Sequence, residues 1–378
     1  MSKAAELAAL IANVNNGSSL GNKNLVINGA MNVAQRGTSG AGLGASAGYF
    51  TVDRWDMYFT GTAGRLTQAQ IADGPSGFAN CMKLSCTTAD TSIAAGENVI
   101  LQQHIEGQNC QALCKGTADA KPITVSFWVK GNASATYTCG LWDNDNSRQN
   151  NQTFAVTTSW NRIELTFPAD TTGALDDDTA NSLGFYIYLQ AGSTYTGGTF
   201  TSGTWASVTN ANTVKSDQTQ FFDSTSRTFF ITGVQMEIGE KATEFEHEPF
   251  STTLSKCERY FKTSYEYGTY AGDVLSPTGS GSTSTAGCLN MTTAGNINRA
   301  FGSIQFSVKM RDAPTMVFYA PESGTNDKAR DITSDVDIGI DPQDNCTIGE
   351  GGGGVQSTGT INAVTDTLGY HYTATSEL

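Results

Sequence analysis

Alternating apolar and polar positions dominate the chain from about residue 24 to residue 250. The clearest run covers residues 123–130. One of its faces carries Ile123, Val125, Phe127 and Val129, and the other carries Thr124, Ser126, Trp128 and Lys130. Because successive side chains of a strand point to opposite sides, this run predicts a strand with one buried face.

The same period of two recurs along this region. Alternating apolar residues lie in 82–86, 99–105, 137–141, 163–167, 183–189 and 230–238. Leu25-Val26-Ile27, directly before Asn28-Gly29, predicts the first strand. With the turn residues between the runs, the region predicts about eight to ten half-buried strands, which is typical of a β-sandwich or jelly roll.

Two short helices are predicted. Residues 4–14 place an apolar stripe at helical spacing, consisting of Leu7, Leu10, Ile11 and Val14. A helix of this length is marginal alone, so we interpret it as an anchor or assembly helix, with a disordered tail as the alternative. The second helix, carrying Leu254 and Cys257, is predicted to lead into a C-terminal region.

The C-terminal region predicts a smaller β domain. Apolar alternation in 304–310 and 316–318, around a turn at 311–314, predicts a hairpin. Gly349–Gly354 contains five glycines and predicts a loop, and 369–374 predicts the last strand. The chain is therefore predicted to be all-β, with an N-terminal helix and linker at 1–22, a jelly-roll domain at 23–250 and a C-terminal β-sandwich at 251–378.

Charge excludes some classes of partner. The 378 residues are 15% charged, with a net charge of −14 and a pI near 4.6. An acidic chain neutralises no phosphates, which argues against a nucleic-acid partner. No apolar stretch is long enough to predict insertion into a membrane.

Eight cysteines are spread along the chain without the density of a disulfide scaffold: Cys81, Cys86, Cys110, Cys114, Cys139, Cys257, Cys288 and Cys346. We expect free, buried thiols and assembly in a reducing cytoplasm. Cys110 and Cys114 near His104 offer a zinc alternative, but the second cysteine pair lacks metal-ligand spacing.

The sequence gives only weak evidence for metal-binding or catalytic residues. Asp143-Asn144-Asp145-Asn146 alternates oxygen ligands but lacks the rest of a calcium loop, so a solvated hairpin tip is favoured, as it is for Asp176-Asp177-Asp178. The three histidines fall in no known catalytic pattern. Glycan cleavage needs only two suitably spaced carboxylates, so the 36 acidic residues leave this activity open as an alternative. No metal, no cofactor and no enzymatic activity are predicted.

Several segments in order resemble the common module of bacteriophage tail-fibre and related virion appendage proteins. They read NLVINGAMNVAQRG, YFTVDRWDMY, PITVSFWVKGNA, SWNRIELTF and TGVQMEIGEKATEFEHEPFSTTLSKCERYF, with FSVKMRDAPTM and GYHYTATSEL resembling the family's C-terminal domain. The resemblance implies a jelly roll like those of carbohydrate-binding modules, a first strand near the last one, and a homotrimer. The carboxylate expected after Asn28-Gly29 for a structural calcium is replaced by Ala30, Met31 and Asn32, with Gln235 and Glu237 on the closing strand, which puts that calcium in doubt.

Strand phase identifies candidate binding residues. Trp128, Tyr186 and Tyr188 lie between core positions, so their rings are predicted to face away from the core and to stack on sugar rings. The alternative is that a loop, a second domain or another subunit covers them. We expect a non-enzymatic tail fibre that sits on the virion and attaches to host glycans. A capsid or tail decoration protein without receptor contact is the alternative, and a polysaccharide depolymerase is the third.

Overall fold

The computed structural model describes residues 3, 22–273, 287–293, 299–331, 334–342, 347–358, 361 and 367–378. Its fold is all-β, as predicted. Backbone contacts divide the chain into two compact units. Unit 1 takes in the chain up to Ala34, Thr38–Phe250 and Leu378, and unit 2 takes in Gln35–Gly37 and Ser251–Glu377. The predicted helix carrying Leu7, Leu10, Ile11 and Val14 lies outside the described residues.

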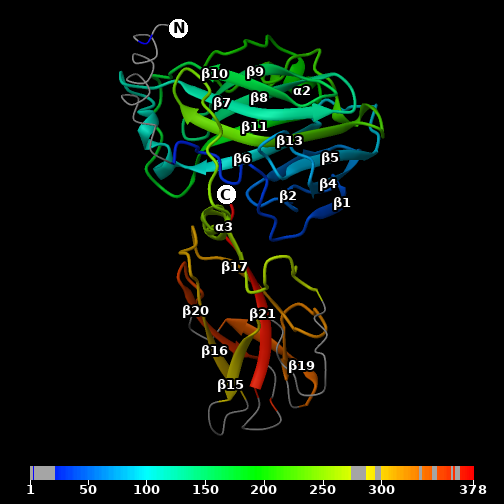
Figure 1. Cartoon of the computed structure of the whole chain (residues 1–378), viewed down its shortest axis with the longest axis vertical. Coiled ribbons are helices and arrows are strands. Elements are labelled where there is room, and N and C mark those ends of the chain that lie inside the picture. Colours follow the sequence, from blue (N-terminus) through cyan, green and yellow to red (C-terminus); the bar gives the residue numbers. More distant parts are fainter. Residues whose placement is uncertain are drawn as a thin grey trace. The chain divides into compact units, whose positions relative to one another are not determined.

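Unit 1 contains two antiparallel sheets (Figure 1). The six-stranded sheet runs in the order β1 (Ser39–Leu43), β4 (Arg65–Ile71), β5 (Cys81–Thr88), β13 (Thr228–Ile238), β7 (Ile123–Gly131) and β10 (Asn161–Phe167). The seven-stranded sheet runs in the order β12 (Ala206–Ser207), β9 (Arg148–Val156), β8 (Ala135–Asp143), β11 (Asn181–Ala191), β6 (Asn98–Glu106), β3 (Asp56–Thr60) and β2 (Gly48–Tyr49).

The core of unit 1 lies between these sheets. Phe127 on β7 meets Phe154 on β9 and Phe185 on β11 edge-to-face, with ring centroids 5.0 and 6.2 Å apart. Because these rings come from opposite sheets and all three are buried, the sheets pack face to face as a sandwich. The core-facing positions predicted for 123–130 are confirmed, since each of those four side chains is at least 96% buried.

The regular alternation predicted for 230–238 is wrong in its first half. Phe229 and Ile231 face the core, whereas further along the strand the core positions are Val234 and Met236. The pairing of β13 with β7 slips between Thr232 and Gln235, around Gly233 at φ 64°. An extra residue in one strand of a pair reverses the side-chain phase, which a pattern of period two cannot anticipate.

The predicted first strand, Leu25-Val26-Ile27, is not a strand. The segment is irregular and turns at residues 26–30, although it does lie beside β13. The Leu25 N–H donates to the Met236 carbonyl at 2.9 Å, and the Val234 N–H donates to the Gly29 carbonyl at 3.0 Å. Asn28, at φ 59°, closes the turn by accepting two backbone N–H groups on Oδ1. These side-chain bonds replace the regular ladder.

The remaining short elements of unit 1 are helical turns: η1 (Gly107–Asn109), η2 (Gln111–Leu113), α2 (Ser193–Thr196), η3 (Asn210–Asn212) and η4 (Phe221–Asp223). Residues 192–220, which we call the covering segment, add β12 to the edge of the seven-stranded sheet and also lie over part of its outer face. The Gly203 N–H donates to the Asn151 carbonyl at 3.0 Å, and the Thr213 hydroxyl donates to Gln149 Oε1 at 3.1 Å. The Gly203 bond is main-chain pairing at the sheet edge. Gln149 lies on the opposite face of β9 from the core residue Phe154, so the Thr213 contact places this part of the segment over the outer face.

The helix α3 (Phe250–Glu258) leads into the main part of unit 2, which is otherwise β. Its strands are β14 (Phe261–Thr263), β15 (Leu289–Thr293), β16 (Ala300–Gln305), β17 (Thr315–Tyr319), β18 (Lys328–Asp331), β19 (Val336–Pro342), β20 (Gly352–Ser357) and β21 (Thr367–Thr375). Because β18 pairs with both β19 and β21, the order β21-β15-β16-β20-β19-β18 closes on itself around a core that includes Met291, Ile304 and Leu368.

Two predictions for unit 2 are wrong. β16 and β17 do not form a hairpin, because β16 pairs with β15 and β20 while β17 pairs with β21. The glycine run is not wholly a loop either, since Gly352–Gly354 belong to β20 and pair with Ser303–Gln305. Glycine disfavours a strand only weakly, and here pairing to β16 outweighs that preference.

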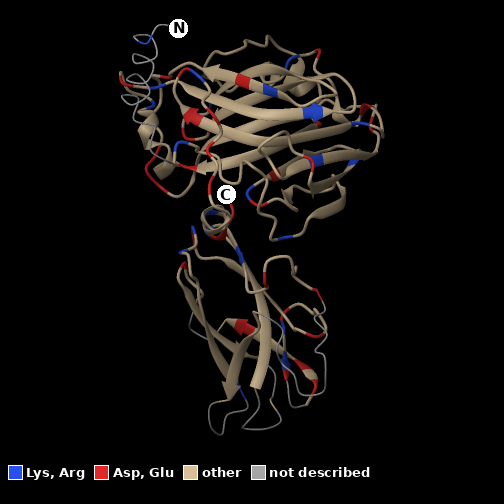
Figure 2. Cartoon of the chain, viewed as in Figure 1, with Lys and Arg blue, Asp and Glu red and all other residues tan. Residues whose placement is uncertain are grey.

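Charged residues are scattered along loops and strands of both units, as Figure 2 shows. Among the described residues, no helix is both long enough and apolar enough to cross a bilayer. Seven cysteines fall in the described ranges and none of these is in a disulfide; five are buried, while Cys114 and Cys288 are half-buried. Cys346 lies outside the described residues.

Candidate functional site

The outer face of the seven-stranded sheet contains a hollow of about 550 Å³. Strands β3, β6, β8 and β11 form its floor, and the covering segment forms one wall. The lining side chains are those of Asp56, Tyr58, Asn98, Ile100, Gln102, His104, Trp142, Asn144, Asn181, Tyr186, Tyr188, Tyr195, Asn210 and Thr213. The hollow lies wholly within unit 1, on the side of the sheet that faces away from the core.

Aromatic rings dominate the floor of the hollow. Tyr186 is central, with its ring centroid 5.8 Å from Trp142, 6.1 Å from Tyr188 and 5.9 Å from His104. Tyr58 on β3 is 39% exposed, and Trp142 is half-buried. Tyr186 and Tyr188 come from β11, Trp142 from β8, His104 from β6 and Tyr58 from β3. The rings lie on one side of the sheet because residues directly opposite in paired strands share a face.

Amide and carboxylate groups surround the rings. Gln102 Nε2 donates to Asp56 Oδ2 at 2.6 Å, and Asn144 Nδ2 donates to Asn181 Oδ1 at 3.2 Å. Asn98 is 97% buried, and its Oδ1 has no hydrogen-bond partner among the described residues. A buried acceptor in a polar hollow can be satisfied by a hydroxyl donor from a ligand.

The tyrosines of the floor keep their protons at neutral pH. Burial raises the pKa of both Tyr186 and Tyr188 well above the usual range, although a hydrogen bond with Asn144 acts in the opposite direction at Tyr186. The Tyr186 hydroxyl lies 3.4 Å from His104 Nε2. Among the described residues that line the hollow, Asp56 is the only Asp, Glu, Lys or Arg.

This combination of groups suits binding of a neutral polyhydroxylated ring. Flat apolar rings can pack against the C–H face of a sugar. The amides can donate to and accept from its hydroxyl groups, and the carboxylate can accept from them. Hydrolysis of a glycosidic bond normally uses two carboxylic acids, whereas this hollow is lined by one, Asp56.

The three aromatic residues singled out from the sequence do not lie together. Trp128 is on β7 of the six-stranded sheet, so it belongs to the opposite side of the sandwich from Tyr186 and Tyr188 on β11. The predicted strand phases are confirmed, because all three side chains face away from the core. The predicted exposure is wrong for the tyrosines: Tyr186 is 9% exposed and Tyr188 is 1% exposed. Neighbouring rings and the covering segment account for this burial, which is the alternative that strand phase left open.

The sequence prediction missed two rings of the hollow that are not fully buried, Tyr58 and Trp142. A signal for Trp142 was present, because Tyr137, Cys139 and Leu141 predict a core face and Trp142 continues the strand on the opposite face. Tyr58 sits next to the core residues Met57 and Phe59 in the same way. Tyr195 lies in the covering segment, and no periodic pattern could have indicated it.

The candidate cation ligands have protein partners. The Asp143 side chain is fully buried and pairs with Lys115, so it is not at a solvated tip. Glu237 accepts from the Gln235 side-chain amide at 2.8 Å and from the Thr243 hydroxyl at 2.7 Å. Within the described ranges, no three or more His, Cys, Asp or Glu side chains are grouped to hold a metal ion.

No family model matches this chain. A comparison with curated proteins also gives no match.

The solved structures that this chain is similar to include carbohydrate-binding modules and a phage protein. A CBM4 structure is 13% identical over 56% of this chain and 97% of its own, with a TM-score of 0.28. A family 11 carbohydrate-binding module from Clostridium thermocellum, in complex with a β-1,3-1,4-mixed-linked tetrasaccharide, is 14% identical over 51% of this chain and 91% of its own, with a TM-score of 0.27. The enzymatically active domain of bacteriophage CBA120 tailspike protein 4 is 12% identical over 57% of this chain and 21% of its own, with a TM-score of 0.29. At such TM-scores none of these likenesses establishes a shared family or function.

Proposed function

We propose that unit 1 binds a neutral glycan in the hollow on the outer face of its seven-stranded sheet. The observation that carries this proposal is the arrangement of Tyr58, Trp142 and Tyr186 beside the buried, unsatisfied acceptor of Asn98. The hollow has the size of an ordinary small-molecule site, which in proteins is a cleft of roughly 300–1,000 Å³.

The accessible rings and the buried rings have different roles in this proposal. Tyr58 and Trp142 have exposed ring surface and would contact the sugar directly. Tyr188, at 1% exposure, supports Tyr186 from below and offers little surface to a ligand. The single carboxylate, Asp56, disfavours an acidic sugar because two like charges would be brought together in a partly desolvated site.

The test is binding of neutral and acidic oligosaccharides on a glycan array, followed by calorimetric titration with the best array ligand. Loss of one stacked ring is expected to cost about 1 kcal/mol, so the W142A and Y58A variants should each bind about fivefold more weakly. Trp128→Ala is the matched control, because Trp128 is also a half-buried tryptophan facing away from the core, but on the other sheet. No bound glycan, or unchanged affinity in W142A and Y58A, would refute the proposal.

The biological setting we propose is a virion appendage, most simply a non-enzymatic tail fibre that attaches to host-surface glycans as a homotrimer. Support comes from the resemblance of the ordered segments between Asn24 and Phe261 to phage appendage proteins. A decoration protein without receptor contact has the same architecture but predicts no glycan affinity, so the titration separates the two. Immunogold microscopy of whole virions tests the location, and absence of label from the particles would exclude it.

A further inference from the structure

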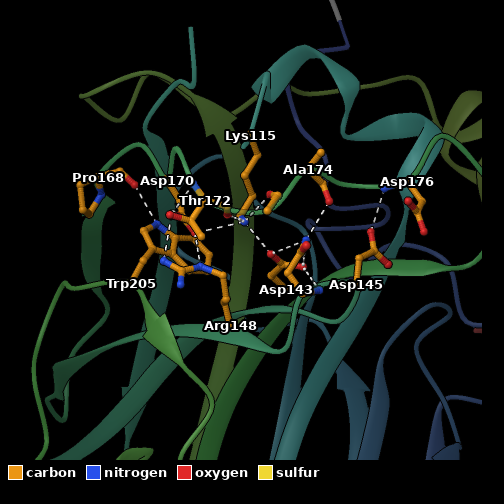
Figure 3. A network of polar contacts seen from close by, with 12 residues as sticks. Lys115, Asp143, Asp145, Arg148, Pro168, Asp170, Thr172, Ala174, Asp176 and Trp205 are labelled. Atoms are coloured by element: carbon orange, nitrogen blue, oxygen red, sulfur yellow. Dashed lines mark hydrogen bonds and ion pairs between the residues drawn. The ribbon is translucent and has the colours of Figure 1, made fainter. Parts of the chain in front are cut away.

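A second built site lies in unit 1, outside the hollow, around the ammonium group of Lys115 (Figure 3). Lys115 Nζ is 2.5 Å from Asp143 Oδ2 and 3.1 Å from Asp170 Oδ2. It is also 2.8 Å from the Thr172 carbonyl and 2.9 Å from the Gly173 carbonyl. Two carboxylates and two main-chain carbonyls therefore converge on one buried positive charge.

We propose that these four oxygens form an internal cation site whose resident cation is the Lys115 ammonium. The three N–H donors of an ammonium match the three hydrogen bonds made to Asp143, Thr172 and Gly173, and the second carboxylate adds a fourth contact. The side chain of Lys115 is 4% exposed, so solvent supplies little of this coordination. The group at this position must therefore be both cationic and a donor of several hydrogen bonds.

The anionic side of the site is fixed by its own partners. Arg148 contacts Asp170 through two parallel hydrogen bonds, Nε to Oδ2 at 2.7 Å and Nη2 to Oδ1 at 3.0 Å. Burial acts to raise the pKa of Asp170, but the hydrogen bonds from Arg148 and Lys115 outweigh it and hold the pKa below its ordinary value. With two cations and two carboxylates in contact, removal of one cation leaves buried negative charge uncompensated.

The cation site connects the 168–174 loop to the turn that carries Asn144. Asp143 Oδ1 accepts from the Asn146 main-chain N–H at 3.0 Å, so the carboxylate held by Lys115 also closes the 143–146 turn. Within this turn the Asn144 N–H donates to the Ser182 carbonyl at 2.9 Å, and the Asn144 side chain reaches the hollow. Lys115 is therefore a positioning residue for one edge of the hollow, and the cation site itself stands whether or not the hollow binds glycan.

The test removes the resident cation and supplies another. In Lys115→Ala the melting temperature should fall by about 10 °C, because one partner of a buried ion pair is lost. Propylammonium chloride should restore much of this loss, whereas propan-1-ol, which has the same length but no charge, should not. The matched control is Lys121→Ala, since Lys121 is exposed and should show neither the loss nor the rescue.

A second readout follows the turn without using any glycan. The Asn144 amide should exchange hydrogen faster in Lys115→Ala and return toward the parent rate with propylammonium. If Lys115→Ala fails to fold, the K115M/D143N double variant removes both charges of one pair; it should fold and show no propylammonium effect. Equal rescue by propan-1-ol would show simple cavity filling and overturn the proposal. A Lys115→Ala variant with the same melting temperature as Lys121→Ala would also overturn it.

Discussion

Replacing Gly29 with alanine tests how the opening segment is held against β13. A Cβ built on Gly29 would lie 2.0 Å from the carbonyl oxygen of Val234, closer than any real contact. The obstacle is main chain and cannot rotate away. The segment must therefore move outward by about 1 Å or more before the contact becomes tolerable.

That movement would break two hydrogen bonds. The Val234 N–H donates to the Gly29 carbonyl at 3.0 Å, and Asn24 Nδ2 donates to the Val234 carbonyl at 3.0 Å. At about 1 kcal/mol for each bond, with about 1 kcal/mol or more for residual overpacking, the variant should lose about 3 kcal/mol of folding free energy. For a unit of roughly 200 residues this corresponds to a fall of about 10 °C in melting temperature.

Differential scanning calorimetry on the full chain measures the shift, and hydrogen exchange at the Leu25 and Val234 amides locates it. Gly96→Ala is the control, because a Cβ at Gly96 meets nothing within 4 Å and its φ is not positive. That variant should match the parent or gain up to about 1 kcal/mol. If both variants melt within about 2 °C of the parent, the close approach of Gly29 to β13 does not hold the opening segment.

Two further predictions concern titratable groups. Burial lowers the pKa of His371 to about 4, below its value of about 6.5 in an unfolded chain, so protonation favours unfolding. The free energy of unfolding of unit 2 should therefore be highest above about pH 6.5 and fall as the pH is lowered towards 4. In His371→Gln the free energy of unfolding should change less over this range. Urea midpoints that fall equally with pH in the parent and in the variant would contradict the reasoning. All eight cysteines should be alkylated without reductant after unfolding. In the native chain Cys114 and Cys288 should react first, and the fully buried Cys81, Cys139 and Cys257 last among the described thiols. A stoichiometric disulfide, or early labelling of these three, would contradict this prediction.

Strand existence and strand phase were determined by the sequence alone in most of unit 1. The alternation in 123–130 or 183–189 is a local property, because each side chain's direction follows from its neighbour's. That reasoning correctly predicted that the side chains of Trp128, Tyr186 and Tyr188 face away from the core. It could also have indicated Trp142, which continues the strand of Leu141 on the opposite face.

Pairing between distant segments was decided only by the tertiary structure. β7 and β11 carry equally clear patterns but belong to different sheets, so Trp128 is separated from the tyrosines. β17 pairs with the last strand, not with its neighbour β16, and the bulge at Gly233 reverses the phase of β13. The burial of Tyr188 depends on the covering segment, and the Lys115 site depends on carbonyls some 57 residues further along the chain. None of these contacts can be predicted from the alternation of apolar and polar residues. Each results from packing between distant segments, and the pattern of each segment is consistent with its own secondary structure whichever partner it pairs with.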